Sequence, residues 1–269
     1  MDEQTFARVK KFIKDQYYID INRYKKKQMH RRLSAWLRRS RATNWSDYFQ
    51  MVREDTEEED RFRDYLTINV TSFFRDPDRW ESIQHEVMPQ LLAGLNGSSY
   101  AGNPGLKIWS AGCSIGAEPY SLAILMDRVS PGRKHEIVAT DFDRGALLRA
   151  RAGGPYSKDD VKHVSAGDLK KYFQQEGEAF FVKDRLRKSI RFQEQDLLSS
   201  SFETGFHLIV CRNVVIYFTR AIKEDLYQKF HTSLTEDGVL FLGGTEIIPQ
   251  SRKMGYRNIG GSVYKRIQR

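Results

Sequence analysis

The fold of this chain is decided by the stretch Lys107-Ile108-Trp109-Ser110-Ala111-Gly112-Cys113-Ser114-Ile115-Gly116-Ala117-Glu118-Pro119-Tyr120-Ser121. It combines a predicted buried strand, a turn of small residues and a helix that begins near Pro119. Such a unit brings backbone N–H groups and a carboxylate, here Glu118, next to any ligand above the strand end. The glycines Gly112 and Gly116 lack the G-x-G-x-x-G spacing that holds the pyrophosphate of a dinucleotide.

A second predicted strand carries an acid at its end. Residues 136–140 are an apolar run that ends in Asp141, which lies 29 positions after Gly112. A carboxylate at this point can accept hydrogen bonds from both hydroxyls of a ribose. The two strand ends together suggest a cofactor that contains a nucleoside. Polar segments also follow the third and fourth predicted strands, at 196–197 and 211–218, where ligands of parallel sheets bind.

The composition is that of a globular protein. Of 269 residues, 40% are hydrophobic and 29% charged, which suits one large domain or two smaller ones. No apolar run approaches the roughly 18 to 20 residues of a membrane span, and the charged N-terminus lacks a signal-peptide core, so we expect a cytoplasmic protein without membrane insertion. Cys113 and Cys211 are too few for a disulfide framework and have no partners at metal-ligand spacing, so we predict no metal site.

The net charge of +9 is concentrated in the first 46 residues, which favours an acidic partner there. On the predicted second helix, four cations fall within roughly 80° of arc at 100° per residue. They are Lys27, Arg31, Arg38 and Arg41. An apolar set occupies the opposite side: Met29, Leu33, Trp36 and Leu37. The cationic stripe is either a solvated helix face or a docking surface.

The chain divides into segments of different pattern. Residues 1–75 are predicted to form a helical, basic domain of about four helices, 76–105 a linker helix and loop, and 106–269 an α/β domain. Predicted strands separated by helices imply a mostly parallel sheet: 106–111, 135–140, 190–194, 206–211 and 238–243. Residues 255–267 suggest a last antiparallel hairpin or strand. A small antiparallel insertion is expected within about 154–192, with runs at 180–182 and 189–192 around a charged turn.

Four motifs in order resemble the CheR-type family, the chemotaxis receptor glutamate O-methyltransferases that use S-adenosylmethionine. They are Asn69-x-Thr71-x-Phe73-Phe74-Arg75, Trp109 to Ser121, Ala139-Thr140-Asp141-x-Asp143, and Cys211-Arg212-Asn213-Val214-x-Ile216-Tyr217-Phe218. The resemblance spans essentially the whole chain. It implies a Rossmann-like S-adenosylmethionine-dependent methyltransferase sheet with an antiparallel last strand, an N-terminal helical domain, and a cofactor between the two.

The resemblance also implies roles for individual residues. Contacts to the cofactor, whose product form is S-adenosylhomocysteine, would come from Asn69, Thr71, Arg75, Glu118, Asp141, Asp196, Leu197, Asn213 and Val214. Arg75 and Tyr217 would lie nearest the reacting methyl group as the catalytic residues. Two positions depart from the common pattern. Ala117 stands where many members carry a second acid, and Asp196 where asparagine is also common.

The expected chemistry needs no general base. A glutamate side chain with a pKa near 4.3 is ionised at neutral pH and can attack a sulfonium methyl group directly. Arg75 is our hypothesis for orienting that carboxylate, because a guanidinium matches its geometry. The expected partner is the acidic helical cytoplasmic region of a chemoreceptor, lying along the cationic stripe, with the enzyme acting as a monomer. The short turn around 183–185 argues against tethering to a receptor C-terminal peptide.

Two alternatives stay open. A nucleic-acid methyltransferase would suit the basic N-terminal segment, because lysine and arginine can follow phosphates. However, residues 212–215 lack the proline-containing turn of base amino-methylating enzymes, and no aromatic residues are interleaved for base stacking, so we expect no nucleic-acid partner. A non-catalytic cofactor-binding adaptor is the second alternative, although the recognised contact positions are intact.

Overall fold

The computed structural model describes residues 1–17, 19–67, 69, 71–95 and 105–268. The chain divides into two compact units. The first comprises Met1–Ile68 with Ile216–Glu224, and the second comprises Asn69–Val215 with Asp225–Arg269. The division falls between positions 68 and 69, earlier than the boundary at 75 that we expected. Most of the loop predicted at the end of the segment 76–105 lies outside the described residues.

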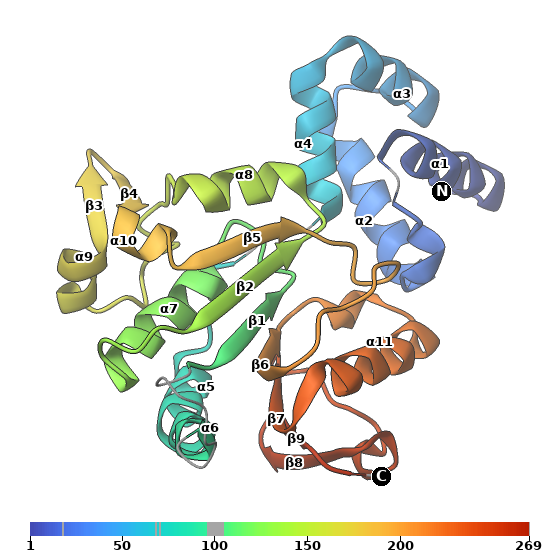
Figure 1. The fold of residues 1–269 in the computed structure, drawn as a ribbon. Helices are drawn as coiled ribbons and strands as arrows, with labels where there is room; N and C mark the ends of the chain where they lie inside the picture. Colours follow the sequence, from blue (N-terminus) through green and yellow to red (C-terminus); the bar gives the residue numbers. More distant parts are fainter. Residues whose placement is uncertain (18, 68, 70, 96–104, 269) are drawn as a thin grey trace. The chain divides into compact units, whose positions relative to one another are not determined.

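The first unit is built from helices, as predicted. These are α1 (Glu3–Tyr17), α2 (Lys26–Arg39), α3 (Trp45–Glu54) and α4 (Thr56–Thr67), with the short 3₁₀ turn η1 (Ile21–Arg23) before α2 (Figure 1). Each helix buries one apolar face. Val9, Leu33, Tyr48 and Phe62, one from each helix, are almost completely inaccessible to solvent. The 3.6-residue period of the sequence therefore produces a shared core among the four helices.

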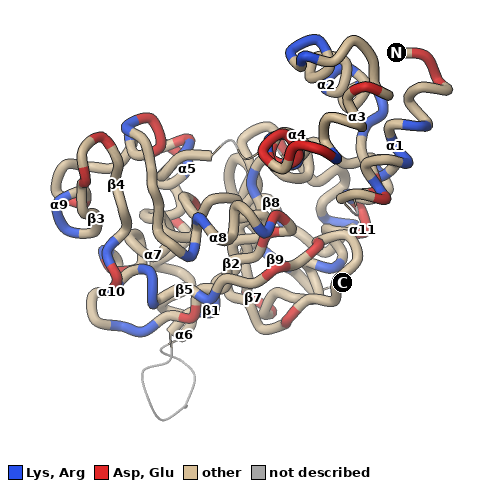
Figure 2. Tube along the Cα trace, turned by 90° about the horizontal axis from the view of Figure 1, so that it is seen from above, with Lys and Arg blue, Asp and Glu red and all other residues tan. Residues whose placement is uncertain are grey.

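The cationic stripe on α2 is shorter than predicted. The helix ends at Arg39, where the backbone N–H of Ser40 donates to the carbonyl oxygens of Trp36 and Leu37. Arg41 therefore lies in the turn beyond the helix, and its assignment to the helical arc was wrong. Lys27, Arg31 and Arg38 remain on α2 with exposed side chains. Figure 2 shows the Lys and Arg residues along this helix in blue.

The second unit contains a seven-stranded sheet in the order β5-β2-β1-β6-β7-β9-β8. Its strands are β1 (Lys107–Ala111), β2 (Glu136–Asp141), β5 (Ile190–Glu194), β6 (Phe206–Cys211), β7 (Leu234–Leu242), β8 (Tyr256–Gly260) and β9 (Val263–Arg266). The first five run parallel, whereas β9 pairs antiparallel with both β7 and β8. The predicted mostly parallel sheet with an antiparallel end is confirmed, and β7 begins four residues earlier than expected.

Helices pack on this sheet and complete its core. They include α7 (Ala117–Val129), α8 (Arg144–Ala152) and α11 (Arg220–Ser233), while η3 (Val215–Tyr217) precedes α11. The segment predicted as a linker helix consists of α5 (Pro77–Ser82), the π-helical turn η2 (Ile83–Val87) and α6 (Met88–Leu95). Its residues Trp80, Ile83 and Met88 belong to the same hydrophobic core as Ile108 and Leu208 of the sheet. This segment is therefore part of the α/β unit, because its apolar face is buried there.

A small antiparallel sheet is present, but one of its predicted strands was wrong. The hairpin joins β3 (Phe173–Glu176) and β4 (Ala179–Val182), between α9 (Ala166–Tyr172) and α10 (Asp184–Arg187). Gly177, with φ +58°, lies in its turn. Residues 190–192 of the second run instead lie in β5, parallel to β2, which confirms the strand predicted at 190–194 for the main sheet. Lys183 is the N-cap of α10, and Asp184 and Arg185 lie within that helix, so the argument against tethering from a short turn at 183–185 no longer applies.

Candidate functional site

The turn between β1 and α7 forms a narrow cradle at the carboxyl end of the sheet. Gly112 and Gly116 have φ values of +83° and +93°, a conformation that favours glycine. A β-carbon added at Gly112 would lie only 2.5 Å from Cγ2 of Val214. The N–H groups of Gly112 and Cys113 both donate to the carbonyl oxygen of Thr140, at 2.8 and 2.9 Å. The turn is thus fastened to the end of β2 and packed against the segment after β6.

Asp141 lies beside this turn, where the sequence predicted the ribose-binding acid. Its Oδ2 accepts a hydrogen bond of 2.7 Å from the Ser114 N–H, and its Oδ1 accepts one of 2.9 Å from the Asp143 N–H. Burial raises the pKa of Asp141 to about 6. Each carboxylate oxygen can accept a second hydrogen bond, so the group retains the capacity to bind two hydroxyls.

Asn69 reaches the same strand ends from the segment that precedes α5. Its Nδ2 donates to Oδ2 of Asp143 at 2.7 Å, and its Oδ1 accepts from the Ser114 hydroxyl at 2.8 Å. Asp143 is buried and also caps α8, because its Oδ1 accepts from the N–H groups of Gly145 and Ala146. This network orients Asn69 next to Asp141. Thr71 follows in the same segment and is half-buried.

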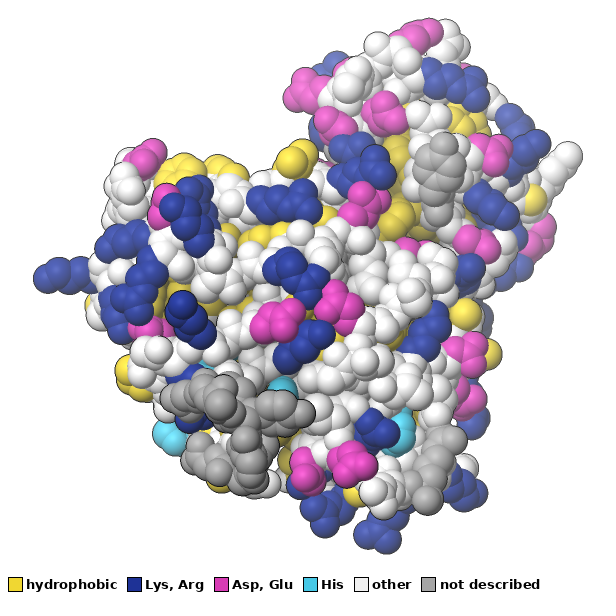
Figure 3. All heavy atoms as spheres, in the orientation of Figure 1, with side chains coloured by type: hydrophobic (Ala, Val, Ile, Leu, Met, Phe, Trp, Pro, Cys, Tyr) yellow, Lys and Arg dark blue, Asp and Glu magenta, His cyan; other side chains and the backbone are white. Residues whose placement is uncertain are grey.

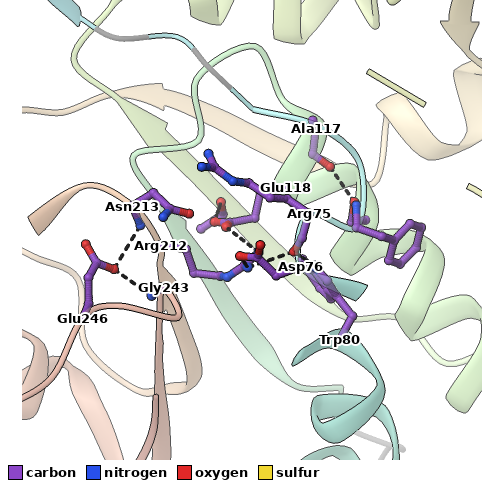
Figure 4. Close-up of polar contacts among 12 residues, drawn as sticks. Arg75, Asp76, Trp80, Ala117, Glu118, Arg212, Asn213, Gly243 and Glu246 are labelled. Carbon is purple, nitrogen blue, oxygen red and sulfur yellow. Dashed lines mark hydrogen bonds and ion pairs between the residues drawn. The ribbon is translucent and has the colours of Figure 1, made fainter. Parts of the chain in front are cut away.

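Glu118, in the first turn of α7, is a buried carboxylate. Its Oε1 accepts a 2.8 Å hydrogen bond from the Ser110 hydroxyl, and 9% of the residue is exposed. Burial raises the pKa of Glu118 to about 7, although the nearby charge of Arg212 and the hydrogen bond from Ser110 act in the opposite direction. Figure 4 shows the Arg75 side chain extending alongside Glu118. A buried acid at a helix N-terminus in a strand-end site is suited to a cationic ligand group.

The corner formed by residues 74–76, which carries Arg75, has a strained backbone and is held by two hydrogen bonds. Phe74 and Asp76 both have positive φ, +48° and +58°, which is unfavourable for residues other than glycine. The Phe74 N–H donates to the Ser121 hydroxyl of α7 at 2.9 Å. The indole N–H of Trp80 donates to the Arg75 carbonyl oxygen at 3.0 Å. These contacts hold the half-buried Arg75 at the site.

Arg212 directly follows β6 and is a buried cation whose role the sequence motif did not indicate. Only 2% of its side chain is exposed. Its Nη2 donates to the Arg75 carbonyl oxygen at 2.8 Å and to Oδ2 of Asp76 at 2.6 Å, and its Nη1 lies 3.9 Å from Oε2 of Glu118 (Figure 4). The signal that was missed is an arginine directly after a continuous buried strand, because a buried charge requires partners.

The remaining predicted contact residues follow β5 and β6. Asp196 accepts from the Leu198 N–H at 2.8 Å and from the Ser199 hydroxyl at 2.7 Å, so its carboxylate organises a turn in which Leu197 is buried. The Gln195 N–H donates to the Asp141 carbonyl oxygen and joins this turn to the end of β2. Asn213 and Val214 are half-buried directly after Arg212.

Tyr217 belongs to the first unit, whereas the other predicted cofactor-binding and catalytic residues belong to the second unit. Its carbonyl oxygen accepts a 2.9 Å hydrogen bond from the Lys25 N–H. The next residue, Phe218, pairs with Tyr24, with their ring centroids 5.3 Å apart. The second predicted catalytic residue is therefore held by the segment that precedes α2, whereas Arg75 belongs to the second unit.

The described residues show neither a cluster of metal ligands nor a helix suited to cross a membrane. Among these residues, no three His, Cys, Asp or Glu side chains gather into a group able to hold a metal ion. In the same residues, no helix combines the length and the apolar character needed to cross a membrane.

The sheet order, the glycine cradle after β1 and the acid at the end of β2 define a Rossmann-like α/β unit with a ligand site at the strand ends. The family model described as "CheR methyltransferase, SAM binding domain" matches residues 69–264, and the model described as "CheR methyltransferase, all-alpha domain" matches residues 4–67. The chain therefore belongs to the CheR methyltransferase family, and S-adenosylmethionine (SAM) is the cofactor of its second domain. The resemblance and the fold class expected from the four motifs are confirmed.

Individual relatives match over nearly their whole length. The chain is 37% identical over 262 residues to the chemotaxis protein methyltransferase of Listeria monocytogenes serovar 1/2a, covering 97% of both proteins. It is 30% identical over 273 residues to the chemotaxis protein methyltransferase of Borreliella burgdorferi, covering 98% of this chain and 94% of that protein. Both domains are thus shared with these relatives.

Proposed function

We propose that this protein transfers a methyl group from S-adenosylmethionine to glutamate side-chain carboxylates in the cytoplasmic helices of chemoreceptors, and so forms glutamate methyl esters. The observation that carries the proposal is the match over 97% of the chain to a relative named chemotaxis protein methyltransferase. The cradle, Asp141 and Glu118 support it, because they are the groups that such a cofactor requires.

The residues at the strand ends fit the chemical parts of the cofactor. Asp141 would accept hydrogen bonds from the ribose hydroxyls, and the buried carboxylate of Glu118 would pair with the cationic amino group of the methionine part. The glycine cradle fits a ligand that approaches the backbone closely, since a β-carbon at Gly112 would fill the space against Val214. Asn69, Thr71, Asp196, Leu197 and Asn213 would complete the contacts. The bound cofactor supplies a methyl group on a positively charged sulfur.

The protein has only to position the substrate carboxylate, because this group is already a reactive nucleophile. A substrate glutamate is ionised near neutral pH, so no residue has to remove a proton. The Arg75 guanidinium would orient this carboxylate. The hydrogen bonds from Trp80 and Arg212 to the Arg75 carbonyl oxygen support that role, because they hold the Arg75 backbone in place. Tyr217 is proposed as the second catalytic residue. Charge is lost as the ester forms, so exclusion of water from the site would favour the reaction.

The cationic stripe is proposed as the receptor-docking surface. Lys27, Arg31 and Arg38 are exposed on α2, and none of them forms an ion pair with another described residue. Figure 3 shows Lys and Arg side chains on the surface of the helical unit. Exposed ion pairs contribute only about 0 to 1 kcal/mol each, so several would give weak, salt-sensitive docking to an acidic helix. Arg41 would add to this surface from the turn after the helix.

The test is methyl transfer itself. Purified protein is incubated with tritiated S-adenosylmethionine and receptor cytoplasmic fragments, in parallel with fragments whose methylation-region glutamates are replaced by alanine and with bulk RNA. Base-labile label that requires the glutamates is the expected result. Base-stable label on RNA, or binding of cofactor without any transfer to receptor fragments, would contradict the proposal. An Arg75→Lys enzyme with unchanged turnover would remove the proposed role of Arg75.

A further inference from the structure

A second buried carboxylate, Glu246, lies behind the site in the segment after β7. Only 1% of this residue is exposed. Its Oε2 accepts two backbone hydrogen bonds, one of 2.7 Å from the Gly243 N–H and one of 3.0 Å from the Asn213 N–H (Figure 4). Glu246 thus joins the end of β7 to the end of β6, and neither the motifs nor the proposed chemistry uses it.

Hydrogen bonds and close packing hold the Glu246 carboxylate in its position. Burial of a carboxylate is unfavourable unless hydrogen bonds compensate it. A β-carbon at Gly243 would lie 2.7 Å from Oε2 of Glu246 and 2.9 Å from the Asn213 nitrogen, so a side chain there would displace the group. The Glu246 N–H also donates to the Gly243 carbonyl oxygen at 2.9 Å, which closes the turn. The turn therefore directs the carboxylate at Asn213.

Asn213 needs such support because of its backbone conformation. Its φ is +60°, which is uncommon for a residue other than glycine. The backbone conformation of Asn213 sets the directions of the side chains on either side of it, Arg212 and Val214. Arg212 reaches the carbonyl oxygen of Arg75 at 2.8 Å, and Val214 packs against the backbone of Gly112. A rotation at Asn213 would therefore disturb both the Arg75 corner and the cradle.

We propose that Glu246 is a positioning residue that holds the Asn213 peptide in its left-handed conformation and thereby shapes the cofactor site. It does not touch the cofactor and acts through Asn213. The inference rests on the proposed function, because Asn213 and Val214 are proposed cofactor contacts. It predicts that loss of the acceptor at position 246 weakens cofactor binding, whereas loss of the negative charge alone does not.

The experiment measures the affinity of the full-length protein for S-adenosylhomocysteine by isothermal titration calorimetry. Glu246→Ala leaves two buried N–H groups without their acceptor and should weaken binding by about 10- to 100-fold. Glu246→Gln retains an oxygen for the same two bonds and should stay within about 5-fold of the parent protein. Glu236→Ala removes an exposed acid of β7 with the same change in charge, and should bind like the parent protein.

A double-mutant cycle with Asn213→Gly separates positioning from a general structural role. Glycine adopts positive φ without strain, so Glu246→Ala should lose clearly less affinity in an Asn213→Gly background than in the native background. Additive losses in the two backgrounds would overturn the inference, as would equal losses for Glu246→Gln and Glu246→Ala in the native background. Failure of the proposed function is a different result: the parent protein would bind S-adenosylhomocysteine but methylate no receptor fragment.

Discussion

The guanidinium of Arg212 donates a 2.8 Å hydrogen bond to the main-chain carbonyl oxygen of Arg75, across 137 positions of sequence. The same nitrogen contacts Asp76, whose φ is +58°. One buried cation therefore connects the end of β6 to the strained corner that carries the proposed catalytic arginine. We therefore expect Arg212 to affect both stability and turnover.

Replacement of Arg212 by lysine should lower both the stability and the turnover of the enzyme. Lysine keeps the charge but lacks the planar fork that spans a carbonyl oxygen and a carboxylate. Because hydrogen bonds to charged groups contribute about 1.5–3 kcal/mol, we expect a loss of unfolding free energy in this range and a fall in turnover of at least about 10-fold. Denaturant unfolding and methyl transfer measure the two effects. Arg220→Lys, at an arginine whose side chain is 78% exposed, is the control, and equal behaviour of the two variants would contradict the prediction.

The buried Glu118 predicts a pH dependence of cofactor binding. Its pKa of about 7 means that the carboxyl group is largely neutral below that pH and must lose a proton to pair with a cationic amino group. Affinity for S-adenosylhomocysteine should rise with pH up to about 7 and then level off, with a limiting slope of about 10-fold per pH unit. Calorimetry over this pH range measures it. Glu118→Gln should bind more weakly and lose the dependence centred near 7, while a residual dependence near 6 would belong to Asp141.

The raised pKa of Glu118 also predicts that the ligand-free protein becomes less stable as pH rises. Between the ordinary pKa of about 4.5 and the folded value of about 7, the folded state binds more protons at Glu118 than the unfolded state does. The contribution of this group to stability is therefore present at low pH and is lost as pH rises through this window. Denaturant unfolding of the parent protein and Glu118→Gln should show this difference, and identical pH profiles would contradict it.

The close approach of Gly112 to Val214 predicts a substitution with a matched control. Gly112→Ala and Gly132→Ala share the cost of positive φ, about 1–2 kcal/mol, because the two glycines have φ +83° and +79°. Only at Gly112 does the added carbon meet a neighbour, Cγ2 of Val214 at 2.5 Å, whereas nothing lies within 4 Å at Gly132. Gly112→Ala should therefore lose more stability and also lose cofactor affinity. Unfolding and calorimetry test this, and Val214→Ala in the same chain should restore part of the stability.

The cationic stripe predicts an effect on substrate affinity alone. Reversal of Lys27, Arg31 and Arg38 to glutamate should raise the KM for receptor fragments by about 10- to 100-fold at low salt, with little change in affinity for S-adenosylhomocysteine. The difference from the parent enzyme should shrink as salt rises. Lys162→Glu, at an exposed lysine of the second unit, should leave KM nearly unchanged. A KM for the parent enzyme that does not respond to salt would refute the docking surface.

Much of the fold could be predicted from the sequence because its signals are local. Apolar runs that end in small or acidic residues located β1, β2 and β6 to within a residue or two. The same local logic placed Asp141 at the end of β2 and Glu118 in the first turn of α7. A strand end and a helix start depend on residues close together in the chain, so their chemistry can be recognised before any contact is known.

Only the tertiary structure decided which side chains support the site. The sequence alone determined a strand-end pattern for a nucleoside-containing cofactor, a helical basic segment and, through four motifs, the family resemblance. It did not determine that the run at 190–194 pairs with β2, that Arg41 leaves the helix, or that Arg212 and Glu246 are buried. Burial and pairing arise from residues far apart in the chain, as when Glu246 meets Asn213 across 33 positions. A charged residue has the same local signature whether it is exposed or buried with a partner, so packing alone distinguishes the two.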